Sequence, residues 1–410
     1  MNCFPWRRST VGLLISLTLI GALFRFINLA QPSTLTGDEV YFANFGRNYL
    51  TQTPFFDVHP PLGKLIIAAG IRLFGFNPFG WRFASALIGT LLIPAVYWFG
   101  WSLSRRRVVA FGLATIVSID GLFLVESRLA AINLGYVLWL MLAYAGFFQF
   151  TRSSRYQVAW LTVSGGALGL AISSKWVALA AWPALIILVL ASGFLGLSEQ
   201  TWSQKKRWWL AGVFYGLLPV SIYLLVWFIH FARLGLPFDW LTAQLKIFIY
   251  HSSITEIHRY ESPWWSWLFL WKPFPYLIDF QPAAVRILTG LGNPLIWWPA
   301  LGLGIAAIFQ NIRRSYQAST LLMLLLFHWL PFIFIKRSMF LYHSIPAFLM
   351  MSALALLFVS SLSPIKRSVI LAIWLIAALA GLIFFIPVYT GAAIAPEAVD
   401  SYRWLPSWFH

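Results

Sequence analysis

Long apolar runs, separated by short polar connectors, cover most of this 410-residue chain. Many of these runs are close to the ~20 residues that an α-helix needs to cross a bilayer. The pattern predicts eleven membrane-spanning helices, at about 11–30, 81–101, 108–125, 132–150, 157–174, 177–196, 209–231, 293–309, 319–335, 340–360 and 368–388. A transmembrane barrel would show short alternating segments instead. The expected fold class is therefore an all-α polytopic membrane protein.

Two outer connectors are much longer than the others, at 31–80 and 233–292. Loops beyond ~15 residues are uncommon unless they carry a function or their own structure. Between Tyr41 and Tyr49, aromatic and polar residues occupy different arcs of a helix, which indicates a short helix lying in the membrane interface. A second short helix is expected to begin at Pro60/Pro61, because proline suits a first helical turn. We expect similar interfacial helices in 233–292.

Composition supports the membrane assignment. The chain is 60% hydrophobic and only 10% charged, and its mean hydropathy is +0.77. Soluble domains are about 25% charged, and no polar stretch is long enough for a separate soluble domain. We therefore expect one membrane domain over 1–410, with a four-helix carboxy-terminal part at 293–410. The single cysteine, Cys3, excludes an internal disulfide and a cysteine-based metal site.

The amino-terminal run has a basic lead, Arg7 and Arg8, like that of a signal peptide. The run is long for the apolar part of a signal peptide and lacks a cleavage site of small residues, so we expect a retained anchor.

The net charge of 29 − 12 = +17 would suggest nucleic-acid binding in a soluble protein. In a membrane protein it is better explained by basic cytoplasmic connectors, and no nucleic-acid partner is expected.

The basic connectors are one-sided. With the amino terminus in the cytoplasm and alternating spans, every basic cluster except Lys336/Arg337 falls on the cytoplasmic side, as the positive-inside rule expects. These clusters are Arg7/Arg8, Arg105–Arg107, Arg152/Arg155, Lys205–Arg207, Arg313/Arg314 and Lys366/Arg367. Of the 12 acidic residues, only Glu199 falls in a cytoplasmic connector. Because acidic residues contribute little to insertion, their position indicates an active face on the outer side.

The segment Gly37–Lys64 carries three of those acids, Asp38, Glu39 and Asp57, beside a predicted span. Carboxylates beside a membrane are costly and often functional. Asp38 and Glu39 point ~100° apart on a helix, so they do not readily share one target; the alternative is that both stabilise a helix dipole.

Asp57 and His59 stand two residues apart before the expected proline turn. Capping of the following helix is an equally good explanation of Asp57. One carboxylate with one histidine is too few ligands to argue a metal site.

These segments resemble the protein O-mannosyltransferases, glycosyltransferase family 39, which have the membrane GT-C fold. The resemblance covers most of the chain in order. It comprises Asp38-Glu39, Phe56–Leu62, Glu126-Ser127-Arg128, Ser174-Lys175-Trp176, Tyr250-His251, His258–Ser262, Trp264–Pro273, Gly292-Asn293-Pro294 with Trp297-Trp298, and Arg337–Pro346.

The resemblance implies an inverting transfer of mannose from polyprenyl-phosphate mannose to Ser or Thr hydroxyls of an exported polypeptide. It implies Asp38 as the base, Glu39 as its support or as an acceptor-positioning group, and Arg128 as a phosphate ligand. Lys175 and Arg337 are expected as further phosphate partners. The remaining expected pocket residues are Asp57, His59, His251, His258, Tyr342 and His343. Arg128 and Lys175 have an alternative role, since cations at span ends often reach for the interface.

The chain departs from the family in two places. Asn133 stands where the family usually has an aspartate, and the large soluble lumenal domain of eukaryotic members is missing, as in a compact bacterial form. The resemblance requires no cofactor, and a Mg²⁺ or Mn²⁺ site formed by Asp38, Glu39 and His59 is left open. Trp264, Trp265 and Trp267 are candidates for stacking a sugar.

Two other functions are consistent with a membrane protein of this kind. One is a related transferase that glycosylates a lipid or an envelope glycan. The other is a transporter, which should carry ionisable residues near mid-span or paired repeats. Arg25 and His230 lie near the outer ends of their spans, and no repeat is visible. We expect an enzyme of a bacterial plasma membrane, with its site on the outer face.

Overall fold

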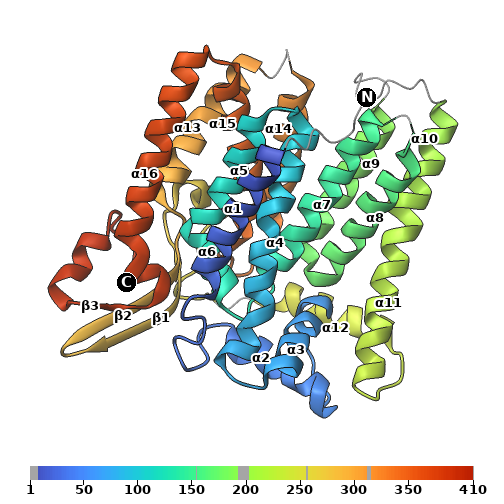
Figure 1. Ribbon diagram of the computed structural model, residues 1–410. Helices are drawn as coiled ribbons and strands as arrows, with labels where there is room; N and C mark the ends of the chain where they lie inside the picture. The colour runs from blue at the N-terminus through green and yellow to red at the C-terminus, as the bar shows by residue number, and fades with distance from the viewer. Residues whose placement is uncertain (1–7, 154, 193–202, 255–256, 312–314, 410) are drawn as a thin grey trace.

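The computed structural model describes residues 8–153, 155–192, 203–254, 257–311 and 315–409 and is a bundle of helices with a small sheet at one end (Figure 1). The α-helices are α1 (Arg8–Phe26), α2 (Glu39–Thr51), α3 (Leu62–Phe74), α4 (Pro78–Ser104), α5 (Arg107–Ile119), α6 (Gly121–Arg128), α7 (Asn133–Arg152), α8 (Gln157–Ser174), α9 (Ala181–Ala191), α10 (Gln204–Ala211), α11 (Leu218–Arg233), α12 (Trp240–Ser253), α13 (Pro294–Asn311), α14 (Tyr316–Trp329), α15 (Ile345–Ser361) and α16 (Pro364–Thr390). Short turns of 3₁₀ helix are η1 (Trp176–Ala180), η3 (Trp264–Phe269), η4 (Leu330–Phe334), η5 (Leu341–Ser344) and η6 (Pro396–Tyr402), and a π-helical turn, η2 (Gly212–Leu217), joins α10 to α11.

Every predicted span coincides with helical structure, but the count of eleven is not confirmed. Among the described residues, seven helical runs are long and apolar enough to cross a membrane: Arg8–Phe26, Pro78–Ser104, Asn133–Arg152, Gln204–Arg233, Tyr316–Phe334, Leu341–Ser361 and Pro364–Thr390. The bent pair α5 and α6 makes an eighth if it is one span. Two further predicted spans correspond to shorter apolar helices, Trp176–Ala191 and Pro294–Gln310.

The bend between α5 and α6 is 57° and is centred on Asp120. The Asp120 carboxylate accepts from the backbone N–H of Leu122 at 3.0 Å, which caps α6. Its other oxygen accepts from the backbone N–H of Asn293 at 2.8 Å and from the indole N–H of Trp297 at 2.9 Å. This buried carboxylate thereby ties α6 to the start of α13. The bend directs Glu126 and Arg128, at the end of α6, away from the axis of α5.

The centre of the bundle is formed by α7 and α15, whose side chains are almost all buried, whereas α1 and α16 expose apolar side chains on the outside. Small residues allow close helix contacts here, as is usual in membranes. A Cβ at Gly165 of α8 would lie 1.9 Å from the backbone oxygen of Phe214, so α8 meets the segment before α11 at backbone distance.

The second outer connector contains strands that we did not predict. β1 (Phe274–Gln281) and β2 (Ala284–Gly290) form an antiparallel hairpin, and β3 (Ala393–Ile394) adds to β2 near the carboxy terminus. The register of β1 is irregular between Pro275 and Leu277, so Tyr276 lies in a bulge. Bulges re-aim side chains. Tyr276 is buried and reaches Glu126 of α6.

The two helices expected in the first outer connector are confirmed as α2 and α3, and α3 starts directly after Pro61. Phe42 and Tyr49 of α2 are buried, but Tyr41, expected on the same arc, is exposed. Elements α2, α3, α12 and the sheet occupy one end of the bundle, which we call the site end (Figure 1).

The opposite end, which we call the basic end, carries the described basic connectors. Arg152 of α7 donates to the backbone oxygen of Leu103 at 2.6 Å, and Arg106 donates to Ser360 at 2.8 Å. These bonds tie the ends of α4, α7 and α15 together. Arg7, Arg313 and Arg314 of the expected clusters, and the acids Glu199 and Glu256, lie outside the described residues.

Candidate active site

Asp38 lies at the N-cap of α2, on the site end, and is partly buried. Its side chain makes no capping hydrogen bond, and no hydrogen bond to it is found among the described residues. Burial raises the pKa of this carboxyl, nearby Lys175 and His258 lower it, and Asp57 raises it. A carboxylate with no fixed partner and a raised pKa is suited to accept a proton.

Glu39, the next residue, is fully engaged by the protein. Its carboxylate accepts from the guanidinium of Arg82 at 2.7 Å through both oxygens. It also accepts from the backbone N–H of Ala130 at 2.8 Å and from the N–H and hydroxyl of Thr36. Both Glu39 and Arg82 are almost completely buried. Glu39 therefore anchors α2 to α4 and to the α6–α7 connector, and in this way fixes the position of Asp38.

This arrangement makes a prediction about stability. Glu39→Gln leaves Arg82 buried without its counter-ion, and breaking a buried ion pair typically costs about 3–5 kcal/mol. We expect a clear fall in the thermal unfolding midpoint of the purified protein in detergent. Asp400→Asn, which removes an exposed ion pair with Arg403, should leave the midpoint nearly unchanged. A variant of Glu39 with native stability but no activity would instead assign this residue to the chemistry.

The guanidinium of Arg128, which the resemblance implies as a phosphate ligand, lies against the end of α1 in this structure. Its guanidinium donates to the backbone oxygens of Phe24, Arg25 and Ile27 at 3.0, 3.1 and 2.7 Å, and to that of Asn28 at 3.1 Å. These carbonyls have no partner within the helix. The structure thus places Arg128 in a structural contact between α6 and α1, not among the cations of the pocket described below.

Asp57 and His59 lie in the connector before α3. Asp57 forms an ion pair with Lys64 of α3, a residue that is buried and that we did not single out from the sequence. The ring of His59 lies 6.0 Å from that of His251, which belongs to α12. The first and second outer connectors therefore meet at these two histidines.

His251 links this meeting point to Arg337. Arg337 donates to Nδ1 of His251, so Nε2 carries the proton and donates to the backbone oxygen of Val58 at 3.0 Å. Burial, together with the neighbouring Arg337, lowers the pKa of His251. A neutral imidazole therefore holds the Arg337 guanidinium in place without neutralising it.

Lys175, between α8 and η1, is also held by a neutral side chain, as Arg337 is. Its ammonium donates to the side-chain oxygen of Asn133 at 2.7 Å, and Asn133 donates to Glu126 at 2.9 Å. The other oxygen of Glu126 accepts from the hydroxyl of Tyr276. Burial raises the pKa of Tyr276, which keeps its proton. Burial also lowers the pKa of Lys175 to about 8.

Lys175 and Arg337 face the same cavity, of about 630 Å³. His59, His251 and His343 also line it. Most of its remaining wall is apolar and comes from η1, the end of α14, and η4: Trp176, Val177, Leu179, Ala180, Phe327, Pro331, Phe332, Phe334 and Ile335. The rest of the wall is formed by Ser252, Ile254, His328, Met339 and a third cation, the exposed Lys336. Phe334 is 83% exposed, so the apolar wall continues onto the outer surface of the bundle. The cavity therefore joins a polar interior to an apolar exterior.

The cavity is electrostatically unbalanced. Among the described residues, Asp57 pairs with Lys64 and Glu39 pairs with Arg82, while neither Lys175 nor Arg337 has a carboxylate within 4.0 Å. Both cations are held by neutral groups, an amide and an imidazole. A buried cation without a counter-ion is costly. The arrangement can therefore be completed by a bound anion.

The other expected pocket residues have mixed surroundings. The ring of Tyr342 lies 4.8 Å from the Lys175 ammonium, a cation–π contact. His343 is buried, and its ring stacks on that of Trp267 at 6.0 Å. His258 is exposed and packs its ring against Phe340.

The three tryptophans that are candidates for stacking a sugar have different surroundings. Trp267 is fully buried and donates to Ser262, so it belongs to the core, whereas Trp265 is 54% exposed. Trp264 packs its ring against that of Trp329, 5.5 Å away.

A divalent cation does not fit the residues proposed for it. Glu39 is committed to Arg82, and in the described part of the chain no group of three or more His, Cys, Asp or Glu residues is arranged to hold a metal. Asp38, Glu39 and His59 therefore do not form a ligand set, and no step below is assigned to a metal.

Lys64, Arg82 and Tyr276 were not singled out from the sequence, and Glu126 was named only as part of a family segment, without a role. Arg82 carried a usable signal, since a cation at the start of a long apolar run needs a partner. Lys64 carried a similar signal, because it is a cation in an apolar stretch and an acid, Asp57, stands seven residues before it. Tyr276 offered no such signal, because its role depends on an unpredicted strand bulge.

Comparison with known proteins agrees with this geometry. Residues 15–81 and 76–234 match the family model described as dolichyl-phosphate-mannose-protein mannosyltransferase. Residues 236–408 match the model of the C-terminal four-helix membrane region of protein O-mannosyltransferase. Together these matches cover almost the whole chain.

Individual relatives are similar over nearly their full length. The polyprenol-phosphate-mannose–protein mannosyltransferase of Mycobacterium tuberculosis (strain CDC 1551 / Oshkosh) is 26% identical over 96% of this chain and 90% of the relative. The enzyme of the same name from Corynebacterium glutamicum is 24% identical over 86% of this chain and 81% of its own length. In three dimensions, a chain of the S. cerevisiae protein O-mannosyltransferase Pmt1–Pmt2 complex, solved with the sugar donor, superposes with a TM-score of 0.86 at 17% identity, covering 99% of this chain and 93% of that one. The expected fold is thereby confirmed.

Proposed function

The chain belongs to the dolichyl-phosphate-mannose-protein mannosyltransferase family, and from this premise and the cavity at Lys175 we propose how it acts. It transfers mannose from polyprenyl-phosphate mannose to a Ser or Thr hydroxyl of an exported polypeptide. The observation that carries the proposal is the pair of cations without carboxylate partners, Lys175 and Arg337, at the inner end of an apolar-walled cavity.

The cavity suits a lipid-linked phosphate. Lys175 and Arg337 bind the phosphate oxygens, and the guanidinium of Arg337 is suited to donate two bonds. The polyprenyl chain leaves along Trp176, Phe332 and Phe334 toward the bilayer. Apolar surface on such a path gains about 25 cal/mol per Å² that is removed from water. Lipid and phosphate are thus recognised by separate parts of one cavity.

Asp38 supplies the base. It removes the proton of the acceptor hydroxyl while the hydroxyl oxygen bonds to the anomeric carbon from the face opposite the phosphate. The bond between the anomeric carbon and the phosphate oxygen breaks, and polyprenyl phosphate leaves with its new negative charge. Lys175 and Arg337 stabilise that charge as it develops. The product carries the sugar with inverted configuration, and the proton is on Asp38.

The arrangement in the membrane follows from the charges. The basic end faces the cytoplasm, as the positive-inside rule requires, and the site end faces outward, in a bacterial plasma membrane. In this arrangement 31–80 and 233–292 are outer connectors of one GT-C domain, 1–410, and 293–410 is its carboxy-terminal four-helix part. Polypeptide acceptors therefore meet the site after export.

Transfer of radiolabelled mannose from polyprenyl-phosphate mannose to a Ser/Thr-rich peptide tests the proposal. We expect label in the peptide with the purified protein in liposomes, and none with a peptide in which every Ser and Thr is Ala. Label that appears in lipid or glycan, but not in the peptide, would move the function to a transferase with another acceptor. Ion-dependent uptake of a solute into sealed liposomes would point to a transporter.

A further inference from the structure

A second lipid-accessible cavity, separate from the candidate active site, lies between α5, α13, α15 and α16. It has a volume of about 360 Å³ and is lined by Arg107, Val108, Phe111, Gly112, Thr115, Ile116, Ile119, Ile296, Leu356, Leu371, Trp374, Leu375 and Ala378. It shares no lining residue with the cavity at Lys175. We call it the α5–α16 groove.

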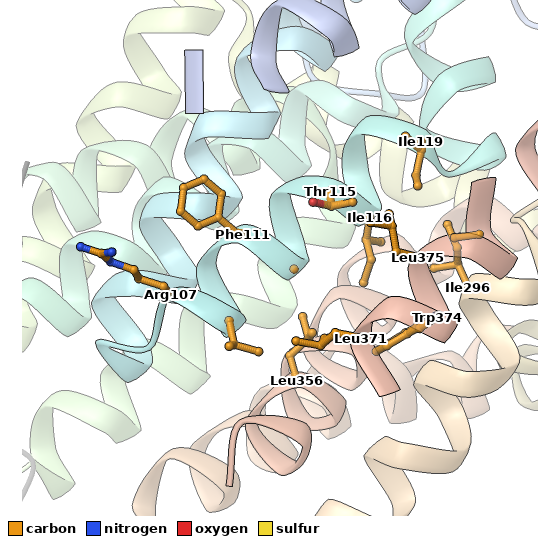
Figure 2. Close-up of a pocket in the computed structure, with 13 residues that line it drawn as sticks. Arg107, Phe111, Thr115, Ile116, Ile119, Ile296, Leu356, Leu371, Trp374 and Leu375 are labelled. Carbon is orange, nitrogen blue, oxygen red and sulfur yellow. The ribbon is translucent and has the colours of Figure 1, made fainter. Parts of the chain in front are cut away.

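The groove has one charged end. Figure 2 shows Arg107 at one end of α5 and Ile119 at the other, with Leu371, Trp374 and Leu375 of α16 along the opposite wall. Twelve residues of α-helix separate Arg107 from Ile119, which is about 18 Å at 1.5 Å per residue. That length slightly exceeds one leaflet, about half of the ~30 Å hydrocarbon core.

Gly112 keeps the floor of the groove open. A Cβ at this position would lie 2.5 Å from a terminal methyl of Leu356, so a larger residue would push into the space between α5 and α15. Apart from Arg107 and Thr115, the lining side chains are apolar. A surface that is mostly apolar within a membrane span suits a hydrocarbon chain, and the only charged side chain in the lining is Arg107 at one end.

The basic residues at one end of the groove favour a ligand with an anionic headgroup. Arg107 is exposed at the basic end, where Arg106 precedes α5 and Lys366 and Arg367 lie in the first turn of α16. The segments 104–119 and 356–378, which form the two long walls and this end, contain no acidic residue. Basic pockets between membrane helices on the cytoplasmic side attract anionic headgroups.

We propose that the α5–α16 groove binds an anionic phospholipid of the leaflet at the basic end, with one acyl chain between α5 and α16 and its phosphate at Arg107. This lipid is not the sugar donor, because the groove and the cavity at Lys175 are lined by different residues and the candidate site lies at the other end of the bundle. The proposal is independent of the reaction. It assigns the groove to lipid that stabilises the packing of α16 on α5.

Native mass spectrometry of the purified full-length protein tests the proposal with phosphatidylglycerol and phosphatidylcholine as probes. We expect phosphatidylglycerol to be retained about tenfold more than phosphatidylcholine by the native chain. Arg107→Glu should lower phosphatidylglycerol retention at least about fivefold, the factor that corresponds to the ~1 kcal/mol that each basic residue near the surface contributes to anionic-lipid binding. Arg155→Glu reverses a charge at the same end but outside the groove and should leave retention unchanged.

Blocking the groove separates specific from general lipid binding. Thr115→Trp should abolish retention of phosphatidylglycerol, and Leu371→Trp blocks the same space from the opposite wall, so the test does not depend on one variant. Native secondary structure and unfolding midpoint are the control for folding. Equal losses in Arg107→Glu and Arg155→Glu, or full retention in both tryptophan variants, would overturn the proposal. A dimer that both tryptophan variants dissociate would assign the groove to a second copy of the chain instead.

Discussion

Replacing Asp38 by Asn is expected to lower kcat for mannose transfer by about 10²- to 10⁴-fold, the range that general-base catalysis contributes. The amide has the size of the carboxylate but accepts no proton at neutral pH. The side chain of Asp38 makes no hydrogen bond among the described residues, and the backbone bonds of this residue do not depend on the carboxylate, so the change should leave the fold intact. The measurement is kcat for the labelled peptide, with donor saturating, in liposomes that contain equal amounts of protein.

The pH profile distinguishes a base from a structural acid. Burial raises the pKa of Asp38 above the usual aspartate range near ~3.9. The carboxylate is the active form, so activity should rise as pH increases through that raised pKa, and this rise should be absent from the residual activity of Asp38→Asn. Asp279→Asn, which changes an acid of β1 whose carboxylate accepts only from the side-chain amide of Gln281 in the described structure, is the matched control. Native activity in Asp38→Asn would remove this residue from the chemistry.

Replacing Lys175 by Met is expected to lower kcat/KM for the donor by about 10²- to 10³-fold, the loss seen when a donor to a developing negative charge is removed. Methionine keeps the length and apolar stem of the side chain but lacks the charge. The effect should appear in KM for the donor as well as in kcat, because the phosphate is already anionic before transfer. Lys205→Met, at an exposed lysine of α10 outside the cavity, should change neither parameter.

The loss of the Lys175 proton predicts how activity changes on the alkaline side of the pH profile. Its pKa is lowered to about 8, so the ammonium is present below that pH and is lost as pH rises through it. We expect kcat/KM to fall above pH 8 in the native protein. Asn133→Asp places a carboxylate against the ammonium, which favours the charged form, so the fall should move to higher pH. An alkaline limb that neither Lys175→Met nor Asn133→Asp alters would show that another group titrates there.

Asn133 illustrates how a departure from a family pattern acquires a physical meaning. From the sequence it was only an amide where an acid is usual. In the structure it joins Lys175 to Glu126 at 2.7 and 2.9 Å, so the lysine is positioned but not neutralised. Glu126 is connected to Lys175 only through the side chain of Asn133, and its carboxylate accepts a hydrogen bond from the hydroxyl of Tyr276. The positive charge of Lys175 is therefore available to the donor phosphate.

Sequence alone was sufficient for the features that depend on local composition. The length of each apolar run determines whether it can form a helix that crosses a membrane, so the positions of the helical runs were predictable, although the count of eleven spans was not confirmed. The first connector was also predictable, with its two short helices and Asp38 at the start of α2. These features are set by residues close together along the chain.

Only the tertiary structure decided which charges are free. Glu39 and Asp38 are neighbours in sequence, yet Glu39 is paired with Arg82, 43 residues away, and Asp38 has no such partner. The guanidinium of Arg128 donates hydrogen bonds to backbone oxygens at the end of α1, about 100 residues earlier in the chain, which no local pattern predicted. Tyr276 and Glu126 meet across 150 residues through an unpredicted hairpin. Buried charges must find partners, and which partner is near is a property of the folded chain.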